Sequence, residues 1–120
     1  MRPKDQGTRF ETEIVNAAHD AGLRAWRLAE GGSHDIGDVA IETTDGDTYV
    51  VECKHRERLG VHQALGKTLA KADKEDGPFL VSGTALVWKR SVLREGNERR
   101  TSEGVVVCVS LGEWLELIGR

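Results

Sequence analysis

The chain of 120 residues has the length of a single domain. Hydrophobic residues make up 38% and charged residues 31% of it, which is the composition of a globular protein and not of a disordered one. No apolar run approaches the roughly 18 residues of a membrane span, and the polar residues 1–10 do not resemble a secretory signal. Two cysteines are too few for a disulfide framework, and no Cys or His spacing predicts structural zinc. We therefore expect one domain over residues 1–120, in the cytoplasm.

The net charge of −3 is unevenly distributed along the chain. Residues 54–100 contain 11 Lys or Arg and 6 Asp or Glu, whereas the rest contains 6 and 14. A metal site beside a phosphate-binding surface would show such a division, and so would ordinary solvated loops and helices. On charge alone the second explanation is preferred.

The first half of the chain predicts one helix and three strands. Residues 1–7 are polar and are expected to form a flexible tail, after which Thr8 and Glu11 match a helix-capping box with Thr8 as N-cap. Apolar residues at helical spacing follow as far as Gly22. The remaining elements are a strand at 23–28, a glycine-rich loop at 30–37, and a hairpin of strands 39–43 and 48–54 around an Asp-Gly turn.

The second half predicts one helix, two strands and a final helix. The helix covers 61–74, a β-rich segment covers 79–88, and 91–104 is expected to be a basic loop. The β-branched run at 105–109 predicts a buried strand, and Ser110 with Glu113 forms a second capping box before the last helix. The order α-β-β-β-α-β-β-α predicts an α/β fold with a mixed sheet flanked by helices.

Three acids and a lysine are the strongest candidates for chemistry: Glu11, Asp38, Glu52 and Lys54. Glu52 and Lys54 are two residues apart on a strand, so they share a face, while Cys53 points to the other face. A charged pair at the end of an apolar strand is costly to bury without a partner such as a cation. A simple surface salt bridge is the competing explanation.

The hairpin decides whether Asp38 joins this pair. A three-residue loop at 45–47 would pair Asp38 with Lys54 and place all three side chains on one face. A two-residue turn would pair Asp38 with Cys53 and turn it away. An active site therefore predicts a three-residue loop or a bulge.

These residue types suit a hard divalent cation. Asp38, Glu52 and the backbone carbonyl of Cys53 offer the oxygen ligands that Mg²⁺ prefers. Such an ion would bind a phosphate oxygen and lower the pKa of an attacking water, while Lys54 would orient that water or stabilise developing charge. Glu11 would hold a second ion or its water shell, although the capping box explains this residue equally well.

Together these residues resemble the PD-(D/E)XK nuclease superfamily, and most closely the archaeal-type Holliday junction resolvases with their phage and bacterial relatives. The resemblance covers roughly residues 4–90 and rests on a glycine before the helix bearing Glu11, on Gly37-Asp38-Val39, and on the apolar strand ending in Glu52-Cys53-Lys54. It departs from the family at Gly37, where proline is common. Asp35 is an alternative to Asp38, which we prefer because it adjoins the strand.

The resemblance implies a restriction-endonuclease-like fold and a Mg²⁺-dependent endonuclease, with Mn²⁺ as a substitute, in a bacterial, archaeal or phage-infected cell. It also implies a homodimer that cuts four-way DNA junctions. Ser33 lies where these resolvases often carry a functional serine, and Gln63 lies where the superfamily often places a polar residue. The basic residues after the fourth strand would bind DNA phosphates, with a solvated loop as the competing explanation: Lys89, Arg90, Arg99 and Arg100.

Two further function classes stay open. One is a related nuclease with another DNA substrate, of the restriction, repair or flap-cutting type, because one fold hosts many specificities. The other is a noncatalytic DNA-binding subunit, against which the complete set of four residues argues.

Overall fold

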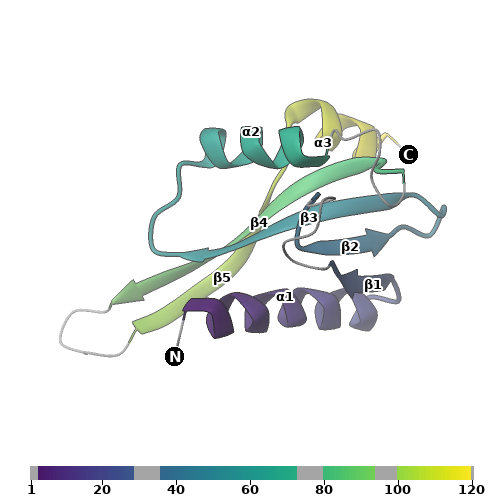
Figure 1. The fold of residues 1–120 in the computed structure, drawn as a ribbon. Coiled ribbons are helices and arrows are strands. Elements are labelled where there is room, and N and C mark those ends of the chain that lie inside the picture. The colour runs from purple at the N-terminus through teal and green to yellow at the C-terminus, as the bar shows by residue number, and fades with distance from the viewer. Residues whose placement is uncertain (1–2, 29–35, 73–79, 94–99, 120) are drawn as a thin grey trace.

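The computed structural model describes residues 3–28, 36–72, 80–93 and 100–119; the side chains of 3–6, 72, 91–93 and 100–103 lie outside this description (Figure 1). The order of helices and strands is the predicted one. The elements are α1 (Pro3–Asp20), β1 (Arg24–Arg27), β2 (Val39–Glu42), β3 (Thr48–Arg56), α2 (Val61–Ala72), β4 (Gly83–Leu93), β5 (Arg100–Cys108) and α3 (Leu111–Ile118).

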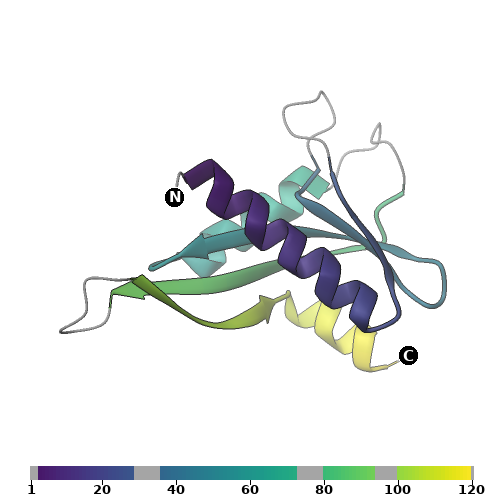
Figure 2. The ribbon, with the colours of Figure 1, turned by 90° about the horizontal axis from the view of Figure 1, so that it is seen from below.

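The five strands form one mixed sheet in the order β1-β2-β3-β4-β5. All neighbouring pairs are antiparallel except β3 and β4, which are parallel because α2 connects them as a crossover. Helix α1 covers one face of the sheet, and α2 and α3 lie on the other (Figure 1). Figure 2 shows α1 running diagonally across the sheet. Among the described residues, no helix is long and apolar enough to cross a membrane.

The core lies between α1 and the centre of the sheet. Phe10 of α1 packs with Val39, Val51, Ala85 and Val87. Because side chains alternate along a strand, Val51 and Cys53 face α1, and Glu52 and Lys54 face α2. The central strand thus supports the core with one face and presents its charged residues on the other.

Helix α1 begins earlier than the sequence suggested. It starts at Pro3, so Pro3–Gly7 is helical and Thr8 is an interior residue instead of the N-cap. Proline is favoured at a first helical position because its missing N–H needs no partner there and its φ suits the helix. The predicted flexible tail therefore belongs to the helix from Pro3 onward.

The region after β4 also differs from the prediction. The expected loop at 91–104 is largely strand, since β4 continues to Leu93 and β5 begins at Arg100. Strand β5 is an edge strand, and its valines at 105, 106 and 107 are exposed where a buried strand was expected. The β-branched run correctly indicated a strand but not its place at the edge.

The hairpin between β2 and β3 has the predicted loop length, shifted by one residue. Thr43 N–H donates to the Asp47 carbonyl at 2.7 Å, which leaves a three-residue loop at 44–46. Gly46 has φ +87°, as the last position of such a loop requires. The register pairs Val39 with Val51. Asp38 precedes β2, and its N–H donates to the Val51 carbonyl, so it does not lie opposite Lys54. The charges of Glu52 and Lys54 still act on the Asp38 carboxyl, so the three side chains are near one another.

Candidate functional site: paired carboxylates beside a basic pocket

Asp38 is fixed at the open end of the hairpin by backbone hydrogen bonds. Its Oδ2 accepts a hydrogen bond from the backbone N–H of Cys53 at 2.8 Å. Its own N–H donates to the Val51 carbonyl at 3.0 Å. These contacts hold the Asp38 carboxylate against the middle of β3, beside Glu52.

Gly37 has a structural reason to be glycine at the position where proline is common. Its φ of +154° is one that other residues rarely adopt, and a Cβ there would overlap Cγ1 of Val50. Val50 is fully buried in the central strand, so it has no room to move. Gly37 therefore lets the chain approach β3 closely enough for Asp38 to reach the Cys53 N–H.

Glu52 is the most unusual charged residue of this region. It is only 5% exposed, and its Oε1 lies 3.5 Å from Lys54 Nζ and 3.3 Å from Lys71 Nζ. Its Oε2 is buried and has no hydrogen-bond partner among the described residues. A buried carboxylate oxygen without a hydrogen-bond partner is costly, and binding of a cation or a water molecule would relieve that cost.

A pocket of about 190 Å³ opens between the end of β3 and helix α2. Glu52 is its acidic lining residue, and the basic residues around it are Lys54, Arg56, Lys67 and Lys71. Lys67 and Lys71 are one helical turn apart on α2, so both reach the same side. A cavity with four cations around one carboxylate is suited to an anion that arrives with a metal ion.

Burial and charge both act on Asp38. Burial raises the pKa of its carboxyl and the neighbouring Glu52 adds to this, while the Cys53 N–H and the ammonium groups of Lys71 and Lys54 oppose it. The pKa of the Cys53 thiol is also raised, first by burial and then by Asp38, Glu11 and Glu52. Cys53 therefore stays protonated and is no nucleophile.

The donor set at this end of the sheet fits Mg²⁺ in part. Asp38, Glu52 and the Cys53 carbonyl supply oxygen atoms, and Mg²⁺ often binds one or two carboxylates while keeping several waters. In the part of the chain that the structure describes, no three His, Cys, Asp or Glu side chains converge as a metal site. The predicted ligand set is thus reduced to two carboxylates and a backbone oxygen.

Glu11 is not brought into this pair. It is buried on α1, and its Oε1 lies 3.6 Å from Nε of Arg27 on β1. Its charge raises the pKa of the Cys53 thiol, after burial and Asp38. The interior position of Thr8 removes the capping-box explanation of Glu11, and its ion pair with Arg27 replaces it.

The predicted DNA-binding residues fall on both faces of the sheet. Arg90 pairs in register with Arg56, so both lie on the face of Lys54, and Gln63 lines the basic pocket. Lys89 lies on the α1 face, where its Nζ is 2.7 Å from Oε2 of Glu13. Lys89 therefore lies outside the basic pocket, and its binding of DNA phosphates stays a prediction. The side chains of four other candidates lie outside the described residues: Ser33, Asp35, Arg99 and Arg100.

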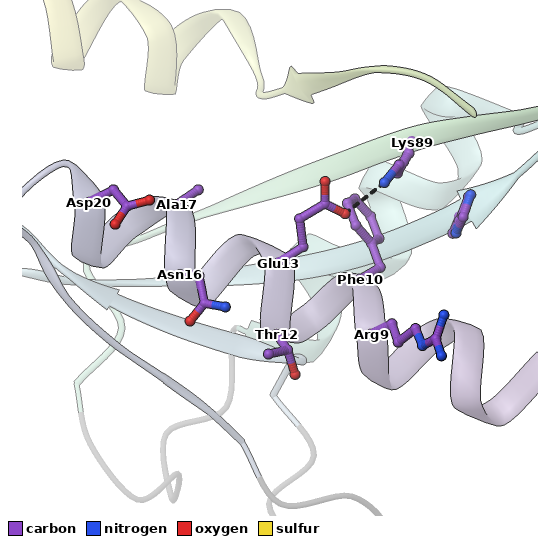
Figure 3. Close-up of a pocket in the computed structure, with 9 residues that line it drawn as sticks. Arg9, Phe10, Thr12, Glu13, Asn16, Ala17, Asp20 and Lys89 are labelled. Carbon is purple, nitrogen blue, oxygen red and sulfur yellow. Dashed lines mark hydrogen bonds and ion pairs between the residues drawn. The ribbon is translucent and has the colours of Figure 1, made fainter. Parts of the chain in front are cut away.

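A larger cavity than the basic pocket lies on the opposite face, along α1 (Figure 3). It measures about 690 Å³, and the ion pair of Glu13 with Lys89 lies at its wall. Burial and the ammonium of Lys89 lower the pKa of His55, which also lines it. Glu13 compensates the charge of Lys89, and both carboxylates among the described lining residues, Glu13 and Asp20, are exposed. We therefore place the candidate site at Glu52.

Sequence reasoning missed three basic residues of the pocket: Arg56, Lys67 and Lys71. Lys67 and Lys71 follow Gln63 at intervals of four, so one helix face carries all three. That spacing was the available signal once Gln63 had been chosen.

No model of a known protein family matches the sequence. A comparison with curated proteins likewise finds no significant match.

Proposed function

We propose that this protein is a Mg²⁺-dependent endonuclease that hydrolyses DNA phosphodiesters. The observation that carries this proposal is the buried, unsatisfied Oε2 of Glu52, beside Asp38 and at the edge of a basic pocket. A carboxylate pair for a divalent ion and a cluster of cations for phosphates are the two components that such a reaction needs.

The chain's own residues would divide the work. Bound Mg²⁺ would supply Lewis-acid activation of the phosphate and of the attacking water. Asp38 is held in place by the Cys53 N–H, so its carboxylate needs little reorganisation. Lys54 would stabilise the charge that develops on the phosphate oxygens, while Lys67 and Lys71 would bind the DNA backbone.

The substrate and assembly in this proposal come from the resemblance to archaeal-type Holliday junction resolvases. A restriction-endonuclease-like arrangement of the sheet and its helices belongs to the same proposal, as does a cytoplasmic location. The substrate would be a four-way DNA junction, and the active species a homodimer, because a two-fold substrate suits a two-fold protein with two sites.

The test is a cleavage assay with Mg²⁺ on a four-way junction, linear duplex, single-stranded and flap DNA. Asp38→Asn, Glu52→Gln and Lys54→Ala should each abolish cleavage and leave the circular-dichroism spectrum unchanged. Asp45→Asn makes the same chemical change in the exposed turn of the hairpin and should cleave at the wild-type rate.

The outcomes separate the candidates. Paired symmetric cuts in the junction support a resolvase, whereas cutting of other substrates keeps the nuclease and removes the junction. Near-native cleavage by Asp38→Asn would show that the site is wrongly assigned. Tight DNA binding without cleavage supports a noncatalytic DNA-binding subunit, a second candidate favoured by the reduction of the predicted ligand set to two carboxylates.

A further inference from the structure

The outer edge of the sheet carries an exposed apolar surface formed by β5 and α3, which we call the β5–α3 surface. Figure 2 shows both elements along the same side of the molecule. On β5 the valines 105, 106 and 107 are 39%, 50% and 63% exposed. Residue 105 pairs with Lys89 and residue 107 with Val87, so both face the α1 side of the sheet. Residue 106 pairs with Trp88 and faces the opposite side. Exposed apolar side chains on both faces are unusual for a strand at an uncovered edge.

Helix α3 repeats the pattern. Leu111, Trp114, Leu115 and Ile118 follow one another at intervals of three and four residues and therefore form one stripe. They are 71%, 52%, 55% and 59% exposed, and no residue of α3 is buried. The helix has a proper N-cap, with the Ser110 hydroxyl accepting from the Glu113 N–H. It is thus a well-formed amphipathic helix, and within the part of the chain that the structure describes its apolar stripe stays exposed.

The size of the β5–α3 surface matches an interface between two proteins. Weighting the exposed fractions by ordinary side-chain areas gives roughly 550 Å² of apolar surface, which is about the non-polar share of the area that each partner buries in a stable dimer. The largest patch on a typical monomeric protein measures about 300–600 Å² and often has a function. The area is about 7% of the 8023 Å² of accessible surface.

The chemistry of this surface selects its occupant. Helix α3 contains two glutamates and no basic residue, so neither DNA phosphates nor anionic lipid headgroups would be attracted to it. Charged residues and proline usually protect an exposed edge strand from pairing with another chain. Residues 104–108 contain neither. Across a two-fold axis, a second β5 would run antiparallel and pair with the free backbone groups of the first.

We propose that a second copy of this chain covers the β5–α3 surface with the same surface of its own. The interface contains none of the residues that line the basic pocket, so each copy keeps its pocket open. This deepens the homodimer of the proposed function. It rests on the exposed surface, and it holds whether or not the protein cleaves DNA.

The test is the mass of the protein in solution, measured by sedimentation equilibrium over a range of concentrations. The wild type should give twice 13.2 kDa. Leu115→Lys and Val107→Lys each place a charge in the interface and should raise the dimer Kd at least about 30-fold, the loss typical of a central interface residue. Thr12→Lys adds the same charge to the exposed side of α1 and should leave the Kd unchanged.

A protein concentration of about 100 µM lies well above the Kd of a stable interface. A wild type that stays monomeric at this concentration would overturn the proposal. A dimer that survives both lysine variants would do the same. Hydrogen exchange of the wild type covers the case in which a variant does not fold. Protection of 104–108 and 111–118 should increase with concentration, and a dimer without that increase would also refute the proposal. Because no readout is cleavage, failure here leaves the nuclease proposal standing.

Discussion

Replacing Gly37 by alanine tests the close approach that positions Asp38. The new Cβ would overlap Cγ1 of Val50 and would sit on a backbone with φ +154°. Such backbone strain costs about 1–3 kcal/mol, and overfilling a packed site costs about 1–3 kcal/mol more. Because Val50 is fully buried, small movements cannot relieve this strain and overlap. We therefore expect Gly37→Ala to lower the free energy of unfolding by about 2–6 kcal/mol.

Gly46 provides the matched control. It also has a positive φ, +87°, but an added Cβ would meet no atom within 4 Å. Gly46→Ala should therefore cost only the backbone part, about 1–2 kcal/mol. Urea denaturation followed by circular dichroism measures both losses, and the difference between them isolates the contact of residue 37 with Val50.

The two results bear directly on the site. If the losses agree within about 0.5 kcal/mol, residue 37 does not press against Val50 and the reasoning is refuted. If Gly37→Ala costs more, as expected, the variant should also show weaker stabilisation by Mg²⁺ than Gly46→Ala, because strain at residue 37 displaces the carboxylate of Asp38.

Three further predictions concern charge and capping. Asp38 has a folded-state pKa raised above 3.8, so its ionisation costs stability as the pH rises through that pKa. Without Mg²⁺, Asp38→Asn should therefore be more stable than the wild type at neutral pH and equally stable below pH 3.8. In thermal melts, Mg²⁺ should no longer stabilise this variant. A variant that is less stable than the wild type at pH 7 would contradict the prediction. The double substitution of Lys67 and Lys71 by methionine should weaken DNA binding and make it less salt-dependent, by about two fewer displaced counterions, in fluorescence anisotropy; an unchanged slope would place the DNA elsewhere. Ser110→Ala removes the N-cap of α3 and should cost about 1 kcal/mol in urea denaturation, and no loss would show that α3 contributes nothing to stability.

Local patterns predicted the elements but left the register of the hairpin open. The Asp-Gly turn allowed a two-residue or a three-residue loop, and only the second would bring Asp38 to the face of Glu52. The structure has a three-residue loop, one residue earlier than expected. Side chains alternate between the two faces of a strand. A shift of the strand pairing by two residues therefore keeps each side chain on its face, whereas a shift by one residue moves it to the other face.

The environment of Glu52 depends on tertiary packing, which local patterns do not contain. Lys71 reaches Glu52 from 19 residues away because the β3–β4 crossover lays α2 over the end of β3. Similarly, the apolar run 105–109 predicted a buried strand, but the place of that strand at the edge of the sheet is not contained in the local sequence. Pro3 and Thr8 both mark helix starts, and the local sequence does not choose between them.

The charges of the basic pocket set a condition on any metal that binds there. Glu52 shares the pocket with Lys54, Arg56, Lys67 and Lys71, and the charges of Lys54 and Lys71 also act on Asp38. Among the described residues of this region, the cations therefore outnumber the carboxylates by two. A divalent ion alone enters an unfavourable field, whereas an ion that shares a DNA phosphate brings compensating negative charge. Mg²⁺ and DNA should therefore bind cooperatively, and each must raise the affinity of the other by the same factor.

This coupling is measurable with Lys54→Ala, which we expect to be inactive, so that the DNA survives the titration. Isothermal calorimetry should give a Mg²⁺ affinity at least about tenfold higher with junction DNA present, a coupling of about 1.4 kcal/mol. Anisotropy titrations should give the same factor for DNA when Mg²⁺ is added. Equal Mg²⁺ affinities with and without DNA would mean that the carboxylates bind the ion without help from a phosphate. The basic pocket would then be a separate anion site and not the second half of a metal-dependent one.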